Sequence, residues 1–283
     1  MALDIIGVCT PIIDLIRTGR KVEKHLGHST LNTIAALSYL GMRTGAIGRV
    51  GKDANGQMVI KDLERLGIGH ERLRKDNLPT AECLIDLDGS ERHFRERSGY
   101  QPLVSLDSDD NAYLKSAKSV FIRAANPLYA QVAAVAKQNG VSLYTTLHAF
   151  PEERIDLQAV ISSGSRVVLC SQDELWQAAA LAEIPKHCEM VVTKGKNGCT
   201  VYSSGRKADF AAFKINAIDT TGAGDAFAAG YIYGDLQGWP IAKKAQFASA
   251  MGALACLQRG ARTRLYSHDE IASFMKTHGV NLA

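Results

Sequence analysis

The chain has 283 residues, of which 46% are hydrophobic and 22% charged, a balance typical of a globular protein with a substantial core. Its formal net charge of +4 is spread along the sequence without a run of like charges, which argues against binding to nucleic acid. No apolar run reaches membrane-spanning length and the first residues lack a basic signal-peptide start, so we expect a cytoplasmic protein without membrane contact. The six cysteines are scattered and include no Cys-x-x-Cys pair, which favours buried reduced thiols over disulfides or zinc ligands.

The N-terminal part begins with an apolar run at 4–9, typical of a buried strand, which leads to Asp14. A helix is expected from Ser29 to Gly41, because polar residues precede its apolar pattern and a glycine ends it. Asn32 lies in the first turn of this helix, where its amide can bind a hydroxylated ligand or cap the local backbone, and both alternatives stay open. A strand at 43–51 and a helix at 53–66 follow.

A charged hairpin is predicted next, with two strands between 80 and 97 joined at the Asp88-Gly89 turn. Its second strand is too charged for the centre of a buried sheet, so we expect a small projecting β lid, built mainly from about 10–26 and 78–101. Strand alternation places Arg95 and Arg97 on one face, which either meets an acidic substrate or faces solvent.

From residue 119 onward, strands alternate with helices, a pattern that predicts a mostly parallel sheet covered on both faces. Ligands of such sheets bind at the carboxyl ends of the strands. The loop from Thr193 to Gly198 follows one such end. The expected strands are 119–123, 141–147, 166–170 and 189–193, with a further strand from Gly198, and the expected helices are 128–138, 172–182, 223–237 and 240–257.

The segment Asp219-Thr-Thr-Gly-Ala-Gly-Asp225 combines a glycine turn, a helix start and a carboxylate. Gly222 and Gly224 allow a tight turn that brings backbone N–H groups close to a ligand. A helix that begins there directs unpaired N–H groups at an anion such as a phosphoryl group. Asp225 would then accept a proton from an attacking hydroxyl, although a carboxylate in a first helical turn is also ordinary capping chemistry.

Taken in order, these segments resemble the PfkB/ribokinase family of carbohydrate and nucleoside kinases over essentially the whole chain. The resemblance rests most strongly on the 219–225 segment. The supporting motifs are Gly7 to Asp14, Gly27-His-Ser-Thr-Leu-Asn-Thr33, Ile47-Gly-Arg-Val-Gly-Lys-Asp-Ala-Asn-Gly56 and Thr193-x-Gly-x-x-Gly198.

The resemblance implies one ribokinase-like α/β/α domain over 1–283 with a mostly parallel central sheet, and a kinase that transfers the γ-phosphoryl group of ATP to an alcohol with the help of Mg²⁺. By analogy, Asp225 would be the catalytic base. The backbone N–H groups of Gly222, Ala223 and Gly224 would form the anion hole.

The same analogy assigns the remaining site residues. Asp14 and Asn32 match ligands of the substrate hydroxyls, next to Gly27 and His28. The nucleotide loop would contain Thr193, Gly195 and Gly198, and Asp219 would lie in a region that binds K⁺ in many members of the family.

Two positions depart from the family pattern. The family usually has two adjacent glycines before its asparagine, whereas this chain has Gly27-His28, and we expect the imidazole to narrow or repolarise the acceptor pocket. Ser171 replaces the asparagine of the family's Asn-x-x-Glu, while Glu174 remains and could organise magnesium-bound water.

The sequence therefore predicts an ATP-dependent small-molecule kinase acting on a sugar or sugar derivative. A nucleoside kinase similar to the adenosine-kinase branch is the main alternative, because 29–33 also resembles that branch. A catalytically silent sugar or nucleotide sensor is the alternative from another class, based on His28 and Ser171. An exposed apolar face of the lid would allow a homodimer.

Overall fold

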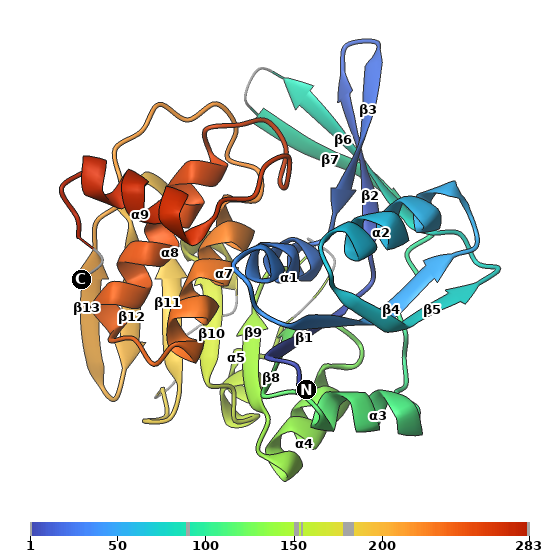
Figure 1. Cartoon of the computed structure of the whole chain (residues 1–283), viewed down its shortest axis with the longest axis horizontal. Coiled ribbons are helices and arrows are strands. Elements are labelled where there is room, and N and C mark those ends of the chain that lie inside the picture. The colour runs from blue at the N-terminus through green and yellow to red at the C-terminus, as the bar shows by residue number, and fades with distance from the viewer. Residues whose placement is uncertain (1, 89–90, 150–152, 154, 178–183, 282–283) are drawn as a thin grey trace.

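The computed structural model describes residues 2–88, 91–149, 153, 155–177 and 184–281, and the fold in this part of the chain is three-layered (Figure 1). Its central sheet has nine described strands in the order β13-β12-β11-β10-β9-β8-β1-β4-β5. The pairs from β11 through β10, β9, β8 and β1 to β4 and β5 are parallel, while β12 and β13 add an antiparallel edge. The strands are β1 (Ile5–Cys9), β4 (Thr44–Gly51), β5 (Gly69–Asp76), β8 (Ser119–Arg123), β9 (Ser142–Thr146), β10 (Val167–Ser171), β11 (Glu189–Thr193), β12 (Cys199–Ser203) and β13 (Arg206–Phe210).

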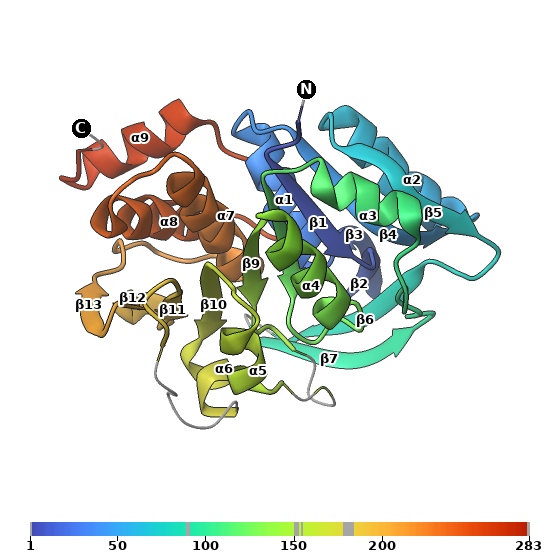
Figure 2. The same ribbon diagram turned by 90° about the horizontal axis from the view of Figure 1, so that it is seen from below.

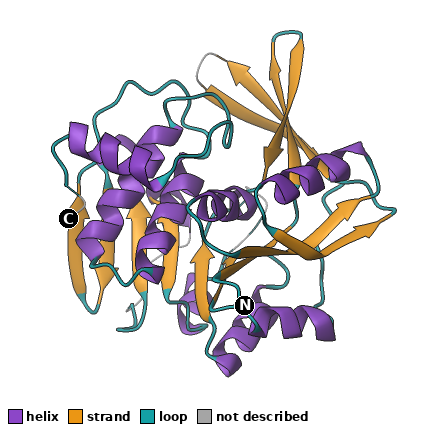
Figure 3. Ribbon diagram, in the orientation of Figure 1, coloured by secondary structure: helices purple, strands orange, loops and turns teal. Residues whose placement is uncertain are grey.

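Helices cover both faces of this sheet, as the alternating pattern predicts (Figures 2 and 3). One face packs against α1 (Ser29–Tyr39), α2 (Ala54–Arg65), α7 (Ala223–Leu236), α8 (Ile241–Ala255) and α9 (His268–Thr277). The other face packs against α3 (Ser108–Lys115), α4 (Tyr129–Asn139), α5 (Leu157–Ser162) and α6 (Gln172–Gln177). Central strands such as β1 and β8 are buried along their whole length, which is why they are short apolar runs.

A second sheet of four described strands, in the order β3-β2-β6-β7, projects beside the main body (Figure 1). Its strands are β2 (Ile12–Thr18), β3 (Lys21–Gly27), β6 (Ala81–Asp88) and β7 (Glu91–Ser98). The charged β7 lies at an edge of this lid sheet, where a charged strand is tolerated. The turn predicted at Asp88-Gly89 lies partly outside the described residues.

Arg95 and Arg97 do not share a face of the lid sheet, contrary to our prediction, because a β-bulge interrupts the pairing of β6 with β7. The register shifts between Leu84 and Ile85, so the simple alternation along β7 is interrupted. Arg97 pairs with Cys83, whereas Arg95 donates from Nε to Asp86 at 2.8 Å. Cys83 and Asp86 are three residues apart on β6 and so point to opposite faces, which means that Arg95 and Arg97 do too.

The apolar face of the lid is covered within this chain. Ile12, Ala81, Cys83 and Ile85 form a buried cluster to which Tyr100 packs. Among the described side chains of the lid strands, Val22 is the one large hydrophobic group that is mostly exposed. The described side chains of these strands therefore form no exposed apolar face, and the homodimer that we predicted from such a face stays a prediction.

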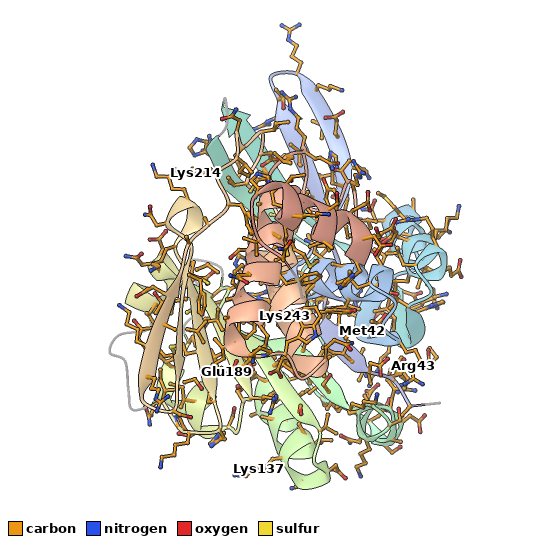
Figure 4. The ribbon with its side chains drawn as sticks, turned by 60° about the vertical axis from the view of Figure 1, so that its left-hand side comes forward. Met42, Arg43, Lys137, Glu189, Lys214 and Lys243 are labelled. Atoms are coloured by element: carbon orange, nitrogen blue, oxygen red, sulfur yellow. The ribbon has the colours of Figure 1, made fainter. Side chains whose placement is uncertain are left out.

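A network of buried charges fixes α7 and α8 to the sheet. Lys244 on α8 donates to Glu189 at 2.6 Å and 2.8 Å and to Asp235 at 2.9 Å. Asp235 also accepts hydrogen bonds from Tyr144 and Arg166 at 2.6 Å and 2.5 Å. Figure 4 labels Glu189 at the start of β11. The network orients α7 and therefore the turn that precedes it.

Several elements were not predicted from the sequence. Strand β5 has the charged sequence GHERLRKD, which lacks the apolar alternation from which a strand is predicted. It is stabilised instead by ion pairs of Arg72 and Arg74 with Asp107 and Asp110 near the start of α3. The other unpredicted elements are α3, α5, β13 and α9, whereas β2 and β3 make up the 10–26 part of the predicted lid, although their separate bounds were not predicted. Helix α6 is described to Gln177, and the rest of the predicted 172–182 helix lies outside the described residues. Among the described residues, no helix combines the length and the apolar character that crossing a bilayer requires.

Candidate active site

The N-terminus of α7 is held by the turn that precedes it. Gly222 caps the helix at φ 73°, and a Cβ at this position would lie 2.5 Å from the carbonyl oxygen of Ala261, so both conformation and space require glycine. Asp219 accepts from the Thr221 backbone N–H at 2.9 Å and hydroxyl at 2.5 Å, and from the Gly260 N–H at 2.8 Å. This carboxylate thus joins the turn to the loop after α8 and fixes where the first N–H groups of α7 point.

Asp225, in the first turn of α7, is linked to α1. Asn32 donates from Nδ2 to Asp225 Oδ2 at 2.8 Å, and Thr33 donates to the Asp225 backbone carbonyl at 3.2 Å. The Asp225 carboxylate therefore accepts a hydrogen bond from another helix rather than capping its own. The Asn32 side chain correspondingly bonds to a residue 193 positions away in the sequence rather than to its local backbone. The Oδ1 atom of Asn32 is buried without a hydrogen-bond partner among the described residues, which leaves an acceptor beside the carboxylate.

Two pockets, described by their lining residues, meet at this turn. The smaller pocket, about 210 Å³, contains Asp225, Asn32 and Asp14 in its wall, and we call it the acceptor pocket. The larger, about 530 Å³, includes Thr220 and Ala223, and we call it the nucleotide pocket. Gly224 lines both, and a Cβ there would meet no atom within 4 Å. The N-terminal end of α7, where a helix presents the positive end of its dipole, therefore faces the junction between them.

In the acceptor pocket, the structure brings Asp14, Gly27, His28 and Asn32 together. Gly27 allows a close approach, because a Cβ on it would lie 2.5 Å from Asp14 Oδ1. His28 has the left-handed φ of 82°, which explains why a glycine suits this position and shows that the imidazole is held in a strained backbone. Its side chain lines the pocket.

His28 is electrostatically unusual. The residue is 8% exposed, and neither ring nitrogen has a hydrogen-bond partner among the described residues. Burial, reinforced by the nearby charges of Arg123, His148 and Arg97, lowers the pKa of His28 well below its usual value of 6.5. The imidazole is therefore neutral at pH 7, so one of its ring nitrogens can donate a hydrogen bond and the other can accept one.

Arg123 and His148 were missed in the sequence and line the acceptor pocket. They lie at and just after the carboxyl ends of β8 and β9, the positions where parallel sheets bind ligands. An arginine that ends the apolar run SVFIR was the available signal. Further missed lining residues are Ile12, Ser29, Cys83, Ile85, Thr221 and Ala261.

The residues of the predicted nucleotide loop line the larger pocket, and nucleotide binding there stays a prediction. Thr193, Gly195 and Gly198 contribute, with Gly195 and Gly198 at φ 54° and 86° around a short 3₁₀ turn. The opposite wall comes from the segment after β13, from which Lys214 projects (Figure 4), and from small residues of α8. The i, i+3, i+4 spacing of Ser249, Gly252 and Ala253 was a readable signal for that face of α8.

Glu174 lies in a capping box at the start of α6. Ser171 N–H donates to Glu174 Oε2 at 2.7 Å, and the Glu174 N–H donates to Ser171 Oγ at 3.1 Å, so Ser171 serves as a helix cap. Burial raises the pKa of Glu174, but hydrogen bonds from His148 and Ser171 outweigh it and hold the pKa below its ordinary value. Glu174 is not among the described residues that line either pocket, and no group of three or more potential metal ligands occurs among the described His, Cys, Asp and Glu residues.

This chain is similar in sequence and in fold to known proteins. A profile of the family described as pfkB family carbohydrate kinase matches residues 4–267. An ATP-dependent ribose-1-phosphate kinase of Halopiger xanaduensis is 29% identical over 88% of this chain and 86% of its own. A 5-dehydro-2-deoxygluconokinase of Geobacillus thermodenitrificans is 26% identical over 89% and 85% of the two chains. The solved structure of Arabidopsis thaliana ribokinase complexed with ribose and ATP has a TM-score of 0.82, with 19% identity over 98% of this chain and 99% of its own.

Proposed function

This chain belongs to the PfkB family of carbohydrate kinases, and from that premise we propose that it transfers the γ-phosphoryl group of ATP to a hydroxyl of a sugar or sugar derivative. The observation that carries the proposal is the position of the α7 N-terminus at the junction of the acceptor and nucleotide pockets, with Asp225 on the acceptor side. This arrangement supports direct transfer from one pocket to the other.

In the proposed reaction, Asp225 accepts the proton of the attacking hydroxyl. Asn32 holds one carboxylate oxygen at 2.8 Å, so the other is available to the substrate. The N–H groups of Gly222 and Gly224, together with that of Ala223, which also donates to the Thr220 carbonyl at 3.2 Å, stabilise the charge on the transferring group, since phosphoryl transfer depends mainly on positioning and electrostatics. Thr193 and the following loop bind the nucleotide.

The acceptor hydroxyls are proposed to bind Asp14, the Asn32 Oδ1 atom and His28, which share one wall of the acceptor pocket. No Phe, Tyr or Trp side chain is among the described residues that line this pocket. A nucleoside base normally stacks on such a side chain, so the lining favours a sugar over a nucleoside as acceptor.

Glu174 fits a supporting role for Mg²⁺, because it is ionised and Mg²⁺ in such sites takes one or two carboxylates, phosphates and several waters. When bound, Mg²⁺ would neutralise charge on the ATP phosphates. Asp219 already accepts hydrogen bonds at both oxygens, so a K⁺ ion nearby would depend largely on backbone carbonyls. We propose both ions, and their omission one at a time from the assay tests them.

The function is tested by ADP release from ATP in the presence of a panel of sugars, sugar derivatives and nucleosides. Asp225→Asn should lower acceptor-dependent turnover by about 10²–10⁴-fold, the range expected for loss of a general base. Asp269→Asn is the matched control, because Asp269 also lies in a first helical turn but is fully exposed on α9. Full activity of the Asp225 variant would contradict the assignment of the base, and ligand binding without any turnover would favour the sensor.

A further inference from the structure

His28 lies where the lid joins α1. It follows Gly27, the last residue of β3, and it is the N-cap of α1, where its side chain makes no capping hydrogen bond. Its carbonyl oxygen accepts a hydrogen bond from the Asn32 N–H at 3.0 Å, so the backbone that carries the imidazole is tied to the helix that carries Asn32. The side chain therefore has a fixed position in the wall of the acceptor pocket.

The imidazole is a buried polar group whose hydrogen bonds are not made within the described part of the chain. The residue is 8% exposed, and both ring nitrogens lack a partner there. Its backbone is also strained, since φ is 82°. Each of these features destabilises a protein, and together they are typical of a residue whose missing partner is a ligand.

A second unsatisfied atom belongs to the same pocket. Asn32 donates from Nδ2 to Asp225, while its Oδ1 atom is buried and without a partner among the described residues. This oxygen can only accept, whereas the neutral imidazole of His28 offers one donor and one acceptor. A hydroxyl group both donates and accepts, so the hydroxyls of one small ring can satisfy both residues.

The other walls of the pocket have little room to retreat from a larger acceptor. On the lid side, Ile12 and Ile85 are 3% and 1% exposed and belong to a packed apolar cluster. On the α7 side, Gly222 approaches Ala261 so closely that a Cβ would lie 2.5 Å from its carbonyl oxygen. Because packed side chains and backbone transmit strain rather than yield, the imidazole of His28 limits the space that remains beside these walls.

The volume that remains is that of a small ligand. The acceptor pocket has about 210 Å³, below the roughly 300–1,000 Å³ of pockets that enclose drug-sized ligands. A single sugar ring belongs to the smaller class, whereas a nucleoside or a disaccharide carries a second ring. With the imidazole in place, that second ring would have to lie outside the pocket.

We propose that His28 restricts the acceptor to a single polyhydroxylated ring, because its imidazole fills the space that a second ring needs and binds one hydroxyl of the acceptor. This inference rests on the proposed kinase function and names the class of acceptor that the site selects. His28 is thus a specificity-determining residue, whereas the transfer itself depends on Asp225.

The size limit is tested with pairs of acceptors that share one sugar ring, with ADP release as the readout. D-Ribose is compared with adenosine, and D-glucose with maltose. The one-ring member of at least one pair should exceed its partner about tenfold or more in kcat/KM, and His28→Gly should lower that ratio about tenfold or more, since even one methylene in a tight pocket changes kcat/KM by about 10–200-fold. Equal turnover of both members by the wild type, or an unchanged ratio in His28→Gly, would overturn the proposal while the kinase function stands.

Ser204→Gly is the matched control for this substitution. Ser204 is the other described non-glycine residue with a positive φ, at 51°, and it is exposed in the turn between β12 and β13. Its replacement relieves backbone strain of the same kind without touching the acceptor pocket, so the ratio should keep its wild-type value. A ratio lowered as much by Ser204→Gly would assign the effect to backbone strain and count against the imidazole.

His28→Asn separates the bulk of the side chain from its hydrogen bonds. Asparagine tolerates a left-handed φ and keeps donor and acceptor groups, but it is shorter than histidine. In the wild type, at least one monodeoxy analogue of the preferred sugar should lose about tenfold in kcat/KM, because a buried group is left unpaired. His28→Gly should abolish that loss and His28→Asn should retain part of it. If every analogue is discriminated as strongly by His28→Gly as by the wild type, the imidazole binds no hydroxyl and the proposal fails.

Binding to the Asp225→Asn variant separates this inference from catalysis. At equal concentration, the one-ring member of at least one pair should raise the melting temperature of that variant more than its two-ring partner does, and the added His28→Gly substitution should reduce the difference. This outcome would support the size limit even if the wild type released no ADP. Equal shifts by both members of both pairs, or no shift by any of them, would count against it whatever the activity.

Discussion

Replacing His28 by glycine should stabilise the protein. His28 has a φ of 82°, a region that costs a non-glycine residue about 1–3 kcal/mol. Its two buried nitrogens, which have no hydrogen-bond partner in the described part of the chain, add a desolvation penalty of about 1–3 kcal/mol. Against these gains, glycine raises the entropy of the unfolded chain by about 0.5–1 kcal/mol. The imidazole borders an open pocket, so its removal leaves no closed cavity.

The net expectation for His28→Gly is an increase of about 1–3 kcal/mol in the free energy of unfolding. Thermal unfolding at pH 7.5 without ligand measures it, and each kcal/mol corresponds to roughly 2–4 °C in a chain of this size. His28→Ala separates the two causes, because it removes the imidazole but keeps a Cβ at the strained φ. Its melting temperature should fall between those of the wild type and the glycine variant.

A His28→Gly variant that melts at or below the wild-type temperature would refute the reasoning. Equal stabilisation by glycine and alanine would show that φ strain contributes nothing. The expected gain in stability comes with a functional loss, since the same variant should bind its acceptor more weakly. Strain and an unpaired polar group at one position are typical of a residue kept for function.

The remaining predictions concern pH, the glycine turn and the buried charges. The folded-state pKa of His28 is lowered, so the unfolded chain takes up this proton first as the pH falls. Below pH 6.5 the free energy of unfolding of the wild type should therefore decrease by up to about 1.4 kcal/mol per pH unit relative to His28→Gly, with no such decrease above pH 7. Urea unfolding at several pH values measures this difference. Gly222→Ala places a Cβ 2.5 Å from the carbonyl oxygen of Ala261 at a left-handed φ. It should lower the free energy of unfolding by at least about 1–2 kcal/mol and, by displacing the turn, lower kcat about 10²-fold. Near-wild-type kinetics would contradict the position assigned to the turn. Lys244→Met leaves Glu189 and Asp235 without their shared cation and should destabilise the fold by about 3–5 kcal/mol in urea unfolding, less at acidic pH, whereas a loss below 1 kcal/mol would contradict this account of the network.

Local sequence determined much of the fold. Short apolar strands, capped helices and glycine turns depend on contacts between near neighbours, so most of the alternating β and α elements after residue 119 were predicted, with α5, β13 and α9 as the exceptions. The segment Asp219 to Asp225 likewise contained its own signal, because a turn, a helix N-terminus and a carboxylate within seven residues have few alternative geometries. The lid hairpin was readable from the Asp-Gly turn and its charged second strand.

Elements stabilised by distant partners were not readable. Strand β5 and helix α3 are joined by ion pairs between Arg72 or Arg74 and Asp107 or Asp110, more than 30 residues away. The lid arginines were placed on the wrong faces, because a bulge in the pairing of β6 with β7 depends on two strands together.

In the candidate site too, some features were predictable from local sequence and others depended on contacts between distant residues. The sequence by itself determined which residue types could bind a phosphoryl group and accept a proton, since these properties belong to the groups themselves. Only the tertiary structure decided that Asn32 orients Asp225, that Arg97 and Arg123 both contact the Glu153 carboxylate, and that His28 has no hydrogen-bond partner among the described residues. These relations arise where strand ends, a helix N-terminus and the lid meet, and the packing of separate layers rather than any local pattern sets the distances between them.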